Sequence, residues 1–252
     1  MEQNNGKSFS FLTPLIIGLS MIVCCAVLVC GFLSYKGRAG HSISATGSAS
    51  VDFESDLVVW RGYFRSEAMT SKAAYDKIKK EASVVNDYLT SNGIAPEEIV
   101  FNSVDITEDY DYYYDDYGNM TGKSLNGYTL EQGVVVTSAN LDAVDKISRD
   151  ISSLLDSGVE FTSFAPEYYC TKLDDVKLDL IEKATENARM RIRIMASQSG
   201  AKIGKLIGSN LGVFQITAAN TGTSNYSYDG YYDTSSRNKT ASITVRLEYG
   251  LR

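Results

Sequence analysis

The chain has 252 residues, of which 44% are apolar, and its 31 acidic residues outnumber 24 basic ones to give a net charge of −7. This much apolar sequence suffices for the core of one folded domain. Because nucleic-acid binding requires a basic face that displaces counterions from phosphates, the acidic balance excludes nucleic acid as an expected partner.

The first element is an apolar segment, residues 11–33, that contains no charged residue. Its length meets the roughly 20 residues that a helix needs to cross the hydrocarbon core of a membrane. A cleaved signal peptide is the alternative, but its apolar region usually covers about 7–15 residues and ends at a small-x-small site. Here Lys36 and Arg38 follow instead. We therefore predict a tail at 1–10, a transmembrane anchor at 11–33 and a short flexible tether at 34–41.

The remaining residues, 42–252, are predicted to form one domain that opens with two strands. Apolar and polar residues alternate from Ile43 to Phe53, which is the period of a strand with one buried face. A second strand is predicted from Leu57 to Arg65. Its expected core side chains share one face of the strand and are Val58, Trp60 and Phe64.

Two helices and two further strands follow. After Thr70 or Ser71, which can cap a helix, apolar residues recur every three or four positions until Gly93. Strands are predicted at Ile99–Thr107 and Tyr128–Thr137. A second helix is expected to begin at Asn140, run through Leu154 and end at Gly158.

The order from Leu57 to Tyr169 therefore reads β-α-β-β-α-β, which predicts a split βαβ sheet with both helices on one face. A third helix is expected over 174–199, with an apolar stripe made of Leu178, Ile181, Ala184, Ala188, Ile192 and Met195. Strands at 203–209, 213–217 and 240–249 complete the pattern, and the last of them alternates so cleanly that we expect it to be central. The predicted fold class is α+β, with a split β-α-β-β-α-β sheet unit, a long helix and C-terminal antiparallel strands after one transmembrane helix.

Several short motifs occur in a specific order over residues 42–250. They are Ile43-Ser-Ala-Thr-Gly47, Gly127-Tyr128, Gly158 with Phe164, Asn187-Ala-Arg189, Ala196, Gly200, Ile203-Gly-Lys-Leu206 and the final Ser242–Tyr249. In these the chain resembles the SIMPL-domain family, bacterial envelope proteins typified by a periplasmic immunogenic antigen associated with the outer membrane. It departs from the family where Ser48-Ala49-Ser50 follows Gly47 and where Phe53-Glu-Ser-Asp56 replaces a Pro-Asp pair. An uncleaved anchor is also unusual for the family.

The resemblance implies an extracytoplasmic, oligomeric protein with no established enzymatic chemistry. Its location would be the inner membrane, crossed once, with the domain in the periplasm. The charges that flank the apolar segment do not decide the orientation, because Lys7 on one side opposes Lys36 and Arg38 on the other.

The sequence offers no catalytic constellation that we can identify. Nucleophilic triads need a histidine near the nucleophile, and the only histidine, His41, lies in the predicted tether. One histidine and one cysteine outside the apolar segment, Cys170, cannot supply a usual zinc ligand set. We expect Cys170 to pack as a small hydrophobe. No catalytic, cofactor or metal residues are therefore predicted, and the protein is not expected to be an enzyme.

Two segments rich in tyrosine and aspartate, 109–117 and 226–233, are unusual. A calcium loop would need an oxygen ligand and a glycine where Tyr113 and Tyr114 stand, so calcium is disfavoured. We expect the first segment to be a solvated hairpin loop. Tyrosine-rich loops also resemble binding surfaces, because rigid amphipathic rings provide contact area at a small loss of entropy. The candidate partner-binding residues are Tyr110, Tyr112, Tyr113, Tyr114, Tyr117, Tyr226, Tyr228, Tyr231 and Tyr232.

Together these observations favour a membrane-anchored, non-enzymatic cell-envelope protein that self-associates or binds envelope partners. The expected partners are the membrane, through residues 11–33, a second copy of the chain, and an envelope protein or glycan. The alternative is a ligand- or ion-binding module that uses the tyrosine and aspartate loops.

Overall fold

The computed structural model describes residues 9–38, 41–219 and 227–252. Its contacts divide the chain into two compact units. Unit 1 consists of residues 1–48, 184–212 and 245–252, and unit 2 consists of residues 49–183 and 213–244. Three long elements have residues in both units, namely β1 (Ser42–Glu54), α4 (Leu173–Gln198) and β10 (Asn238–Leu251).

The N-terminal apolar segment is helical. Helix α1 covers Phe9–Arg38, and its Pro14–Leu33 portion is long and apolar enough either to cross a membrane or to act as a signal sequence. The prediction of a flexible tether that starts at residue 34 was wrong for 34–38, because the helix continues to Arg38. Ser34, Tyr35 and Lys36 include no glycine or proline, so the helix can continue beyond the apolar span and end next to Gly37. Residues 39–40 of the predicted tether and 1–8 of the predicted tail lie outside the described residues.

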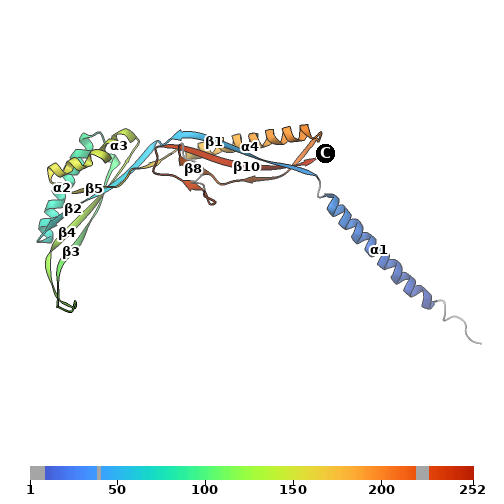
Figure 1. The fold of residues 1–252 in the computed structure, drawn as a ribbon, viewed down its shortest axis with the longest axis horizontal. Coiled ribbons are helices and arrows are strands. Elements are labelled where there is room, and N and C mark those ends of the chain that lie inside the picture. Colours follow the sequence, from blue (N-terminus) through green and yellow to red (C-terminus); the bar gives the residue numbers. More distant parts are fainter. Residues whose placement is uncertain (1–8, 39–40, 220–226) are drawn as a thin grey trace, which may run out of the picture. The chain divides into compact units, whose positions relative to one another are not determined.

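Unit 2 contains the predicted split sheet (Figure 1). The strands lie in the order β3-β4-β2-β5, with β6 also pairing with β2, and every neighbouring pair is antiparallel. Helices α2 and α3 lie on the same side of this sheet. The elements are β2 Leu57–Ala68, α2 Ser71–Ser91, η1 Pro96–Glu98, β3 Ile99–Tyr114, β4 Met120–Ser138, α3 Leu141–Asp150, η2 Ile151–Ser157, β5 Phe161–Ser163 and β6 Glu167–Tyr169.

The predicted helix caps are confirmed. The Thr70 side chain accepts a hydrogen bond from the Ala73 amide at the start of α2, and Asn140 does the same for Ala143 in α3. Gly93 and Gly158 follow the two helical segments with φ values of +94° and +79°, which is the left-handed conformation that glycine adopts most easily. These four residues set the lengths of the elements that cover the sheet.

Two details of the predicted unit were wrong. The second helix ends at Asp150, and a 3₁₀ segment, η2, covers Ile151–Ser157 up to Gly158. The fourth strand is interrupted between β5 and β6, where Ala165 and Pro166 lie outside the ladder. Proline has no amide hydrogen to donate to a neighbouring strand, so the interruption has a simple cause.

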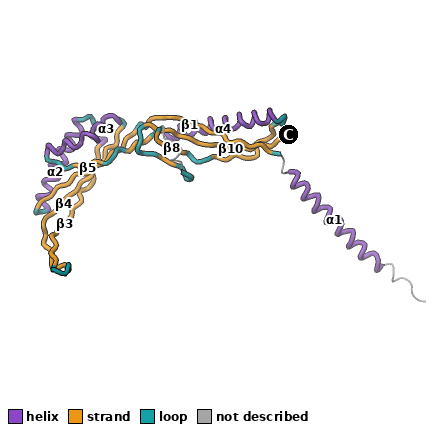
Figure 2. The backbone as a smooth tube through the Cα atoms, in the orientation of Figure 1, coloured by secondary structure: helices purple, strands orange, loops and turns teal. Residues whose placement is uncertain are grey.

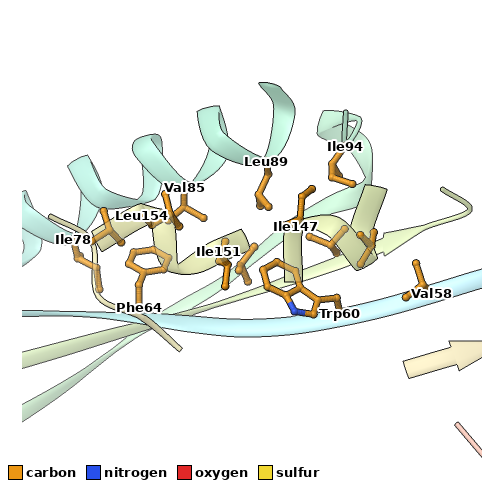
Figure 3. Close-up of a cluster of buried hydrophobic side chains, with 14 of the residues drawn as sticks. Val58, Trp60, Phe64, Ile78, Val85, Leu89, Ile94, Ile147, Ile151 and Leu154 are labelled. Atoms are coloured by element: carbon orange, nitrogen blue, oxygen red, sulfur yellow. The ribbon is translucent and has the colours of Figure 1, made fainter. Parts of the chain in front are cut away.

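The core of unit 2 lies between the sheet and its helices (Figure 3). Val58, Trp60 and Phe64 of β2 are fully buried, as the alternation predicted. Figure 3 shows them facing side chains from α2, α3 and η2, and from Ile94 just after α2. The labelled helical residues are Ile78, Val85, Leu89, Ile147, Ile151 and Leu154. Phe64 also contacts the ring of Phe101 edge-on, with 6.3 Å between the ring centroids.

The second sheet is organised around β10, which confirms that the last strand is central. β1 is one neighbour of β10, and β7 and β8 also pair with it, both antiparallel. The remaining short strand, β9, pairs parallel with β8, which the expectation of purely antiparallel C-terminal strands did not include. The bounds are β7 Ile203–Leu211, β8 Gln215–Ala218 and β9 Tyr231–Tyr232.

The predicted apolar stripe of α4 was partly wrong. Leu178 is 67% exposed and Met195 is 40% exposed, whereas Leu180 and Ala196 are buried. The buried residues recur every four positions and are Leu180, Ala184, Ala188, Ile192 and Ala196. In unit 1 the small residues of this stripe allow close contact with β1, where Gly47 lies against the backbone of Ala184 and Ala188.

Candidate functional site

The first tyrosine-rich segment is part of a long hairpin and not a loop. β3 continues to Tyr114 and β4 begins at Met120, so both strands are longer than predicted. We call residues 109–127 the tyrosine ribbon. The third strand, β2, ends opposite Tyr128, and the ribbon therefore extends beyond it as two strands only (Figure 2). The prediction of a solvated hairpin loop was wrong for residues 109–114, which are strand, whereas residues 115–117 lie in the turn of the hairpin. Tyrosine and threonine favour extended backbone even among aspartates.

A compact turn closes the ribbon. The backbone amides of Tyr117 and Asn119 both donate to Asp115 Oδ1, and the Asn119 side-chain amide donates to Asp115 Oδ2. These hydrogen bonds hold the pKa of Asp115 below its ordinary value, and the bond from the backbone amide of Asn119 has the largest effect. Gly118 has a φ of +80°, which a turn of this kind requires. Both carboxylate oxygens of Asp115 therefore accept hydrogen bonds within the turn and stabilise it.

One face of the ribbon is aromatic. Tyr110 and Tyr112 are neighbours on it, with 6.5 Å between their ring centroids, and alternation places Tyr114 on the same side. The Lys123 ammonium lies 3.9 Å from the centre of the Tyr110 ring, a cation–π contact. Tyr112 is 50% exposed and Tyr114 is 62% exposed. This aromatic face presents rings and one cation to solvent.

The opposite face of the ribbon is polar. The Tyr113 hydroxyl lies 2.8 Å from the Ser124 hydroxyl, and the Thr129 hydroxyl donates to Asp109. Tyr113 is thus separated from the other strand tyrosines, although it is next to them in sequence. Tyr117 lies in the turn and is 91% exposed.

Beside the ribbon lies an acidic cleft of about 520 Å³, which sequence reasoning missed. Its lining residues are Arg65, Glu67, Asp105, Thr107, Asp109, Asn126, Thr129 and Glu131. Strand pairing assembles it, since Glu131 lies opposite both Arg65 and Asp105. Arg65 binds Glu131 at 3.1 Å, and this hydrogen bond raises the pKa of the guanidinium. The alternating polar residues of β2 and β4 indicated a polar face of the sheet. Only the strand register shows which of these residues lie side by side in the cleft.

The second tyrosine group is separate from the first. Tyr226 lies outside the described residues. Tyr228 is 95% exposed, whereas Tyr231 and Tyr232 form the short strand β9. The Tyr232 ring stacks on Tyr169 with 6.4 Å between centroids, and burial raises the pKa of its hydroxyl. No hydrogen bond, ion pair or ring contact between described residues joins Tyr228, Tyr231 or Tyr232 to the tyrosine ribbon. The described candidate tyrosines therefore fall into two groups.

A buried ion pair lies near the second group. Lys239 has no exposed surface, and its ammonium donates to the backbone oxygen of Asp233 and lies 3.8 Å from Oδ2. Burial lowers the pKa of Lys239. Burial raises the pKa of Asp233, but hydrogen bonds from Ser235 and the Lys239 charge outweigh this effect and hold it below its ordinary value. Lys239 is too deeply buried to contact a substrate. Its contacts with Asp233 join the start of β10 to the segment that precedes it, which is a structural role.

The described residues hold no group of three His, Cys, Asp or Glu side chains arranged to bind a metal ion. Cys170 is half-buried, as expected for a packed small side chain. The surfaces that remain as candidates are the aromatic face of the ribbon and the acidic cleft.

Comparison with known proteins agrees with the family resemblance of the motifs. No curated protein matches the chain. The sequence pattern of one family, described as SIMPL, a protein of unknown function (DUF541), matches residues 43–249. This range covers both sheets except for the first residue of β1 and the last two residues of β10, and the chain therefore belongs to the SIMPL family.

Proposed function

We propose that the chain is a non-enzymatic envelope protein that α1 anchors in the cytoplasmic membrane and that associates with further copies through the tyrosine ribbon. The SIMPL domain would lie outside the cytoplasm, as the resemblance to exported envelope proteins implies. The length of α1 supports the anchor, since Pro14–Leu33 meets the roughly 20 residues of a membrane span.

The observation that carries the proposal is the position of the aromatic face. The core of unit 2 ends where β2 ends, so the rings of Tyr112 and Tyr114 contribute little to it. Two-stranded ribbons are marginally stable in water, and aromatic side chains are enriched where proteins meet. An exposed row of tyrosines on such a ribbon is therefore better explained by a partner than by the fold.

A second copy suits this face because the face is self-complementary. It carries rings and also the Lys123 cation, so a copy related by a two-fold axis can place its cation against the other copy's rings. A neutral glycan could stack on these rings but carries no aromatic ring of its own for the Lys123 cation.

The available area predicts weak association. A tyrosine buries roughly 150–250 Å² when it is fully covered, and about half of this is exposed here. The four rings of Tyr112 and Tyr114 in a dimer would bury about 300–500 Å². A stable interface needs about 1,200 Å². Leu125 and Met120, which are 45% and 60% exposed, can add to this area. Anchoring in one membrane would then supply the high local concentration that a small interface needs.

The test is energy transfer between full-length chains that carry donor and acceptor labels after Arg252, mixed in lipid vesicles. We expect transfer above that of random mixing at the same lipid dilution, and competition by unlabelled chain. Replacing Tyr110, Tyr112 and Tyr114 together by serine should reduce transfer to the random level. Tyr113→Ser on the polar face is the matched control and should leave transfer unchanged. Random-level transfer by the unaltered chain, or full transfer by the triple variant, would refute self-association through this face.

A further inference from the structure

The two units differ in the sign of their charge. In unit 1, residues 41–48, 184–212 and 245–252 contain two acids, Glu186 and Glu248. The same segments contain seven basic residues, namely Arg189, Arg191, Arg193, Lys202, Lys205, Arg246 and Arg252. Unit 2 contains 14 basic and 28 acidic residues. A chain that is acidic overall thus has a basic part, and that part includes the attachment of α1.

Backbone hydrogen bonds gather part of this charge at one end of the sheet. The Leu251 amide donates to the His41 oxygen at 2.8 Å, and the Arg252 amide donates to the Lys202 oxygen at 2.8 Å. The start of β1, the start of β7 and the end of β10 therefore meet. Lys202, Lys205 and Arg252 are all exposed there.

Apolar side chains accompany the basic ones. Leu206 and Ile207 follow Lys205 directly in β7 and are 52% and 60% exposed. Exposed aliphatic residues next to lysine and arginine are typical of protein surfaces at a membrane interface, where the aliphatic groups enter the boundary region and the cations meet anionic headgroups. We call Lys202, Lys205, Leu206, Ile207 and Arg252 the basic collar.

The chain itself keeps the collar close to the membrane. Helix α1 ends at Arg38, five residues after the apolar span, which is about 7.5 Å of helix. The headgroup layer is roughly 5–7 Å thick on each side. Three residues separate Arg38 from Ser42, the first residue of β1, and four extended residues reach at most about 14 Å. Because the Leu251 amide donates to the His41 oxygen and the Arg252 amide donates to the Lys202 oxygen, Lys202 and Arg252 lie close to the start of β1. Ile207 follows Lys202 within about 17 Å of extended chain.

We propose that the basic collar binds anionic phospholipid headgroups of the membrane that α1 crosses. This rests on the proposed anchor and adds a lipid preference to it. The contact would orient the domain at the surface, with cations on the headgroups and Leu206 and Ile207 at the boundary. The seven basic residues in segments 41–48, 184–212 and 245–252 have only two acids beside them in the sequence of these segments. Among the described residues, none of the seven takes part in an ion pair.

The test compares lysine acetylation by acetic anhydride in the full chain, reconstituted in nanodiscs of phosphatidylcholine alone or with about 30% phosphatidylglycerol. We expect Lys202 and Lys205 to react roughly threefold more slowly in the anionic discs, and this difference to vanish at about 0.5 M salt. Lys79 and Lys80 of α2, exposed lysines of unit 2, are the internal controls and should react equally in both discs. Arg252→Gln should weaken the protection of Lys202.

Two results would overturn the proposal. One is equal reactivity of Lys202 in both kinds of disc, and the other is equal slowing of Lys79 and Lys80, which would mean that the lipid acts on all lysines alike. Failure of the anchor is seen separately. A chain that has lost residues 1–40 has a lower intact mass and is recognised before labelling, whereas the labelling rates are read from intact chains only.

Discussion

Within unit 1 and within unit 2, the contacts that differ most are made by side chains of different size. Unit 2 buries large residues such as Trp60, Phe64 and Leu130 between a sheet and two helices. Unit 1 instead brings a strand against a helix where Gly47 meets Ala184 and Ala188, so backbone lies directly on backbone. Large side chains stabilise a fold by the apolar area they remove from water. Small side chains stabilise it by letting two backbone segments pack in direct contact. The two units should therefore fail under opposite kinds of substitution.

Unit 2 should be most sensitive to the loss of volume. Phe64 is fully buried and contacts Phe101 and Phe161, so Phe64→Ala leaves a cavity and should lower the free energy of unfolding by about 3–5 kcal/mol. The only tryptophan, Trp60, lies in the same core and reports urea unfolding of the full chain by its fluorescence. Tyr112→Ala on the exposed ribbon is the control and should change the free energy of unfolding by no more than about 0.5 kcal/mol. An unchanged midpoint for Phe64→Ala would mean that this core does not determine the stability of unit 2.

Unit 1 should be most sensitive to the addition of volume. A Cβ atom at Gly47 would lie 2.2 Å from the Ala188 nitrogen and 2.3 Å from the Ala184 oxygen, both in the backbone of α4. Gly47→Ala must therefore separate β1 from α4 and should destabilise their contact by about 1–3 kcal/mol. It would also disturb the hydrogen bonds from the Ser48 amide to Asn187 and from Arg191 to the Thr46 oxygen.

Hydrogen exchange of the α4 amides in the full chain measures this effect, and we expect faster exchange over 184–196. Gly208→Ala is the matched control, because a Cβ there would have no atom within 4 Å. If both variants exchanged alike, close approach of backbone would not be what holds unit 1 together.

The same contrast explains what could be predicted from the sequence. Alternation placed Val58, Trp60 and Phe64 correctly in the core, because large apolar residues that share one face of a strand are usually buried together. The stripe of α4 was harder to predict, because Leu178 and Leu180 both fit a helical period and the sequence does not say which of them meets the rest of the fold. The tyrosine ribbon was read as a loop because its aspartates and glycines suggest turns, while the ladder that keeps it extended joins residues far apart in the sequence.

Two further features could not be predicted without the fold. The acidic cleft requires the register of three strands, and no local pattern contains it. The basic character of unit 1 is invisible in the overall charge of −7, because the unit is assembled from three separate segments of the chain.

The smallest expected effect concerns one carboxylate that joins two segments of unit 2. Asp56 Oδ1 accepts a hydrogen bond from the Thr171 amide at 2.7 Å, and Oδ2 accepts one from the Thr171 hydroxyl at 2.6 Å. The hydroxyl bond and then the amide bond hold the pKa of Asp56 below its ordinary value of 3.8. A lowered pKa means that the ionised form stabilises the fold, so this contribution is present above about pH 4 and is lost as the pH falls through the folded-state pKa.

Asp56→Asn should therefore lower the free energy of unfolding by about 0.5–1.5 kcal/mol at pH 7, and the difference from the unaltered chain should shrink toward pH 3. Urea unfolding read by Trp60 fluorescence at pH 7, 4 and 3 measures it. Asp116→Asn, at an exposed position in the turn of the ribbon, is the matched control and should have no effect at any of these pH values. A difference that stayed constant from pH 7 to pH 3 would show that the amide loses packing or geometry and not charge. In that case the carboxylate of Asp56 would contribute to unit 2 through its shape alone, in the way that the small residues contribute to unit 1.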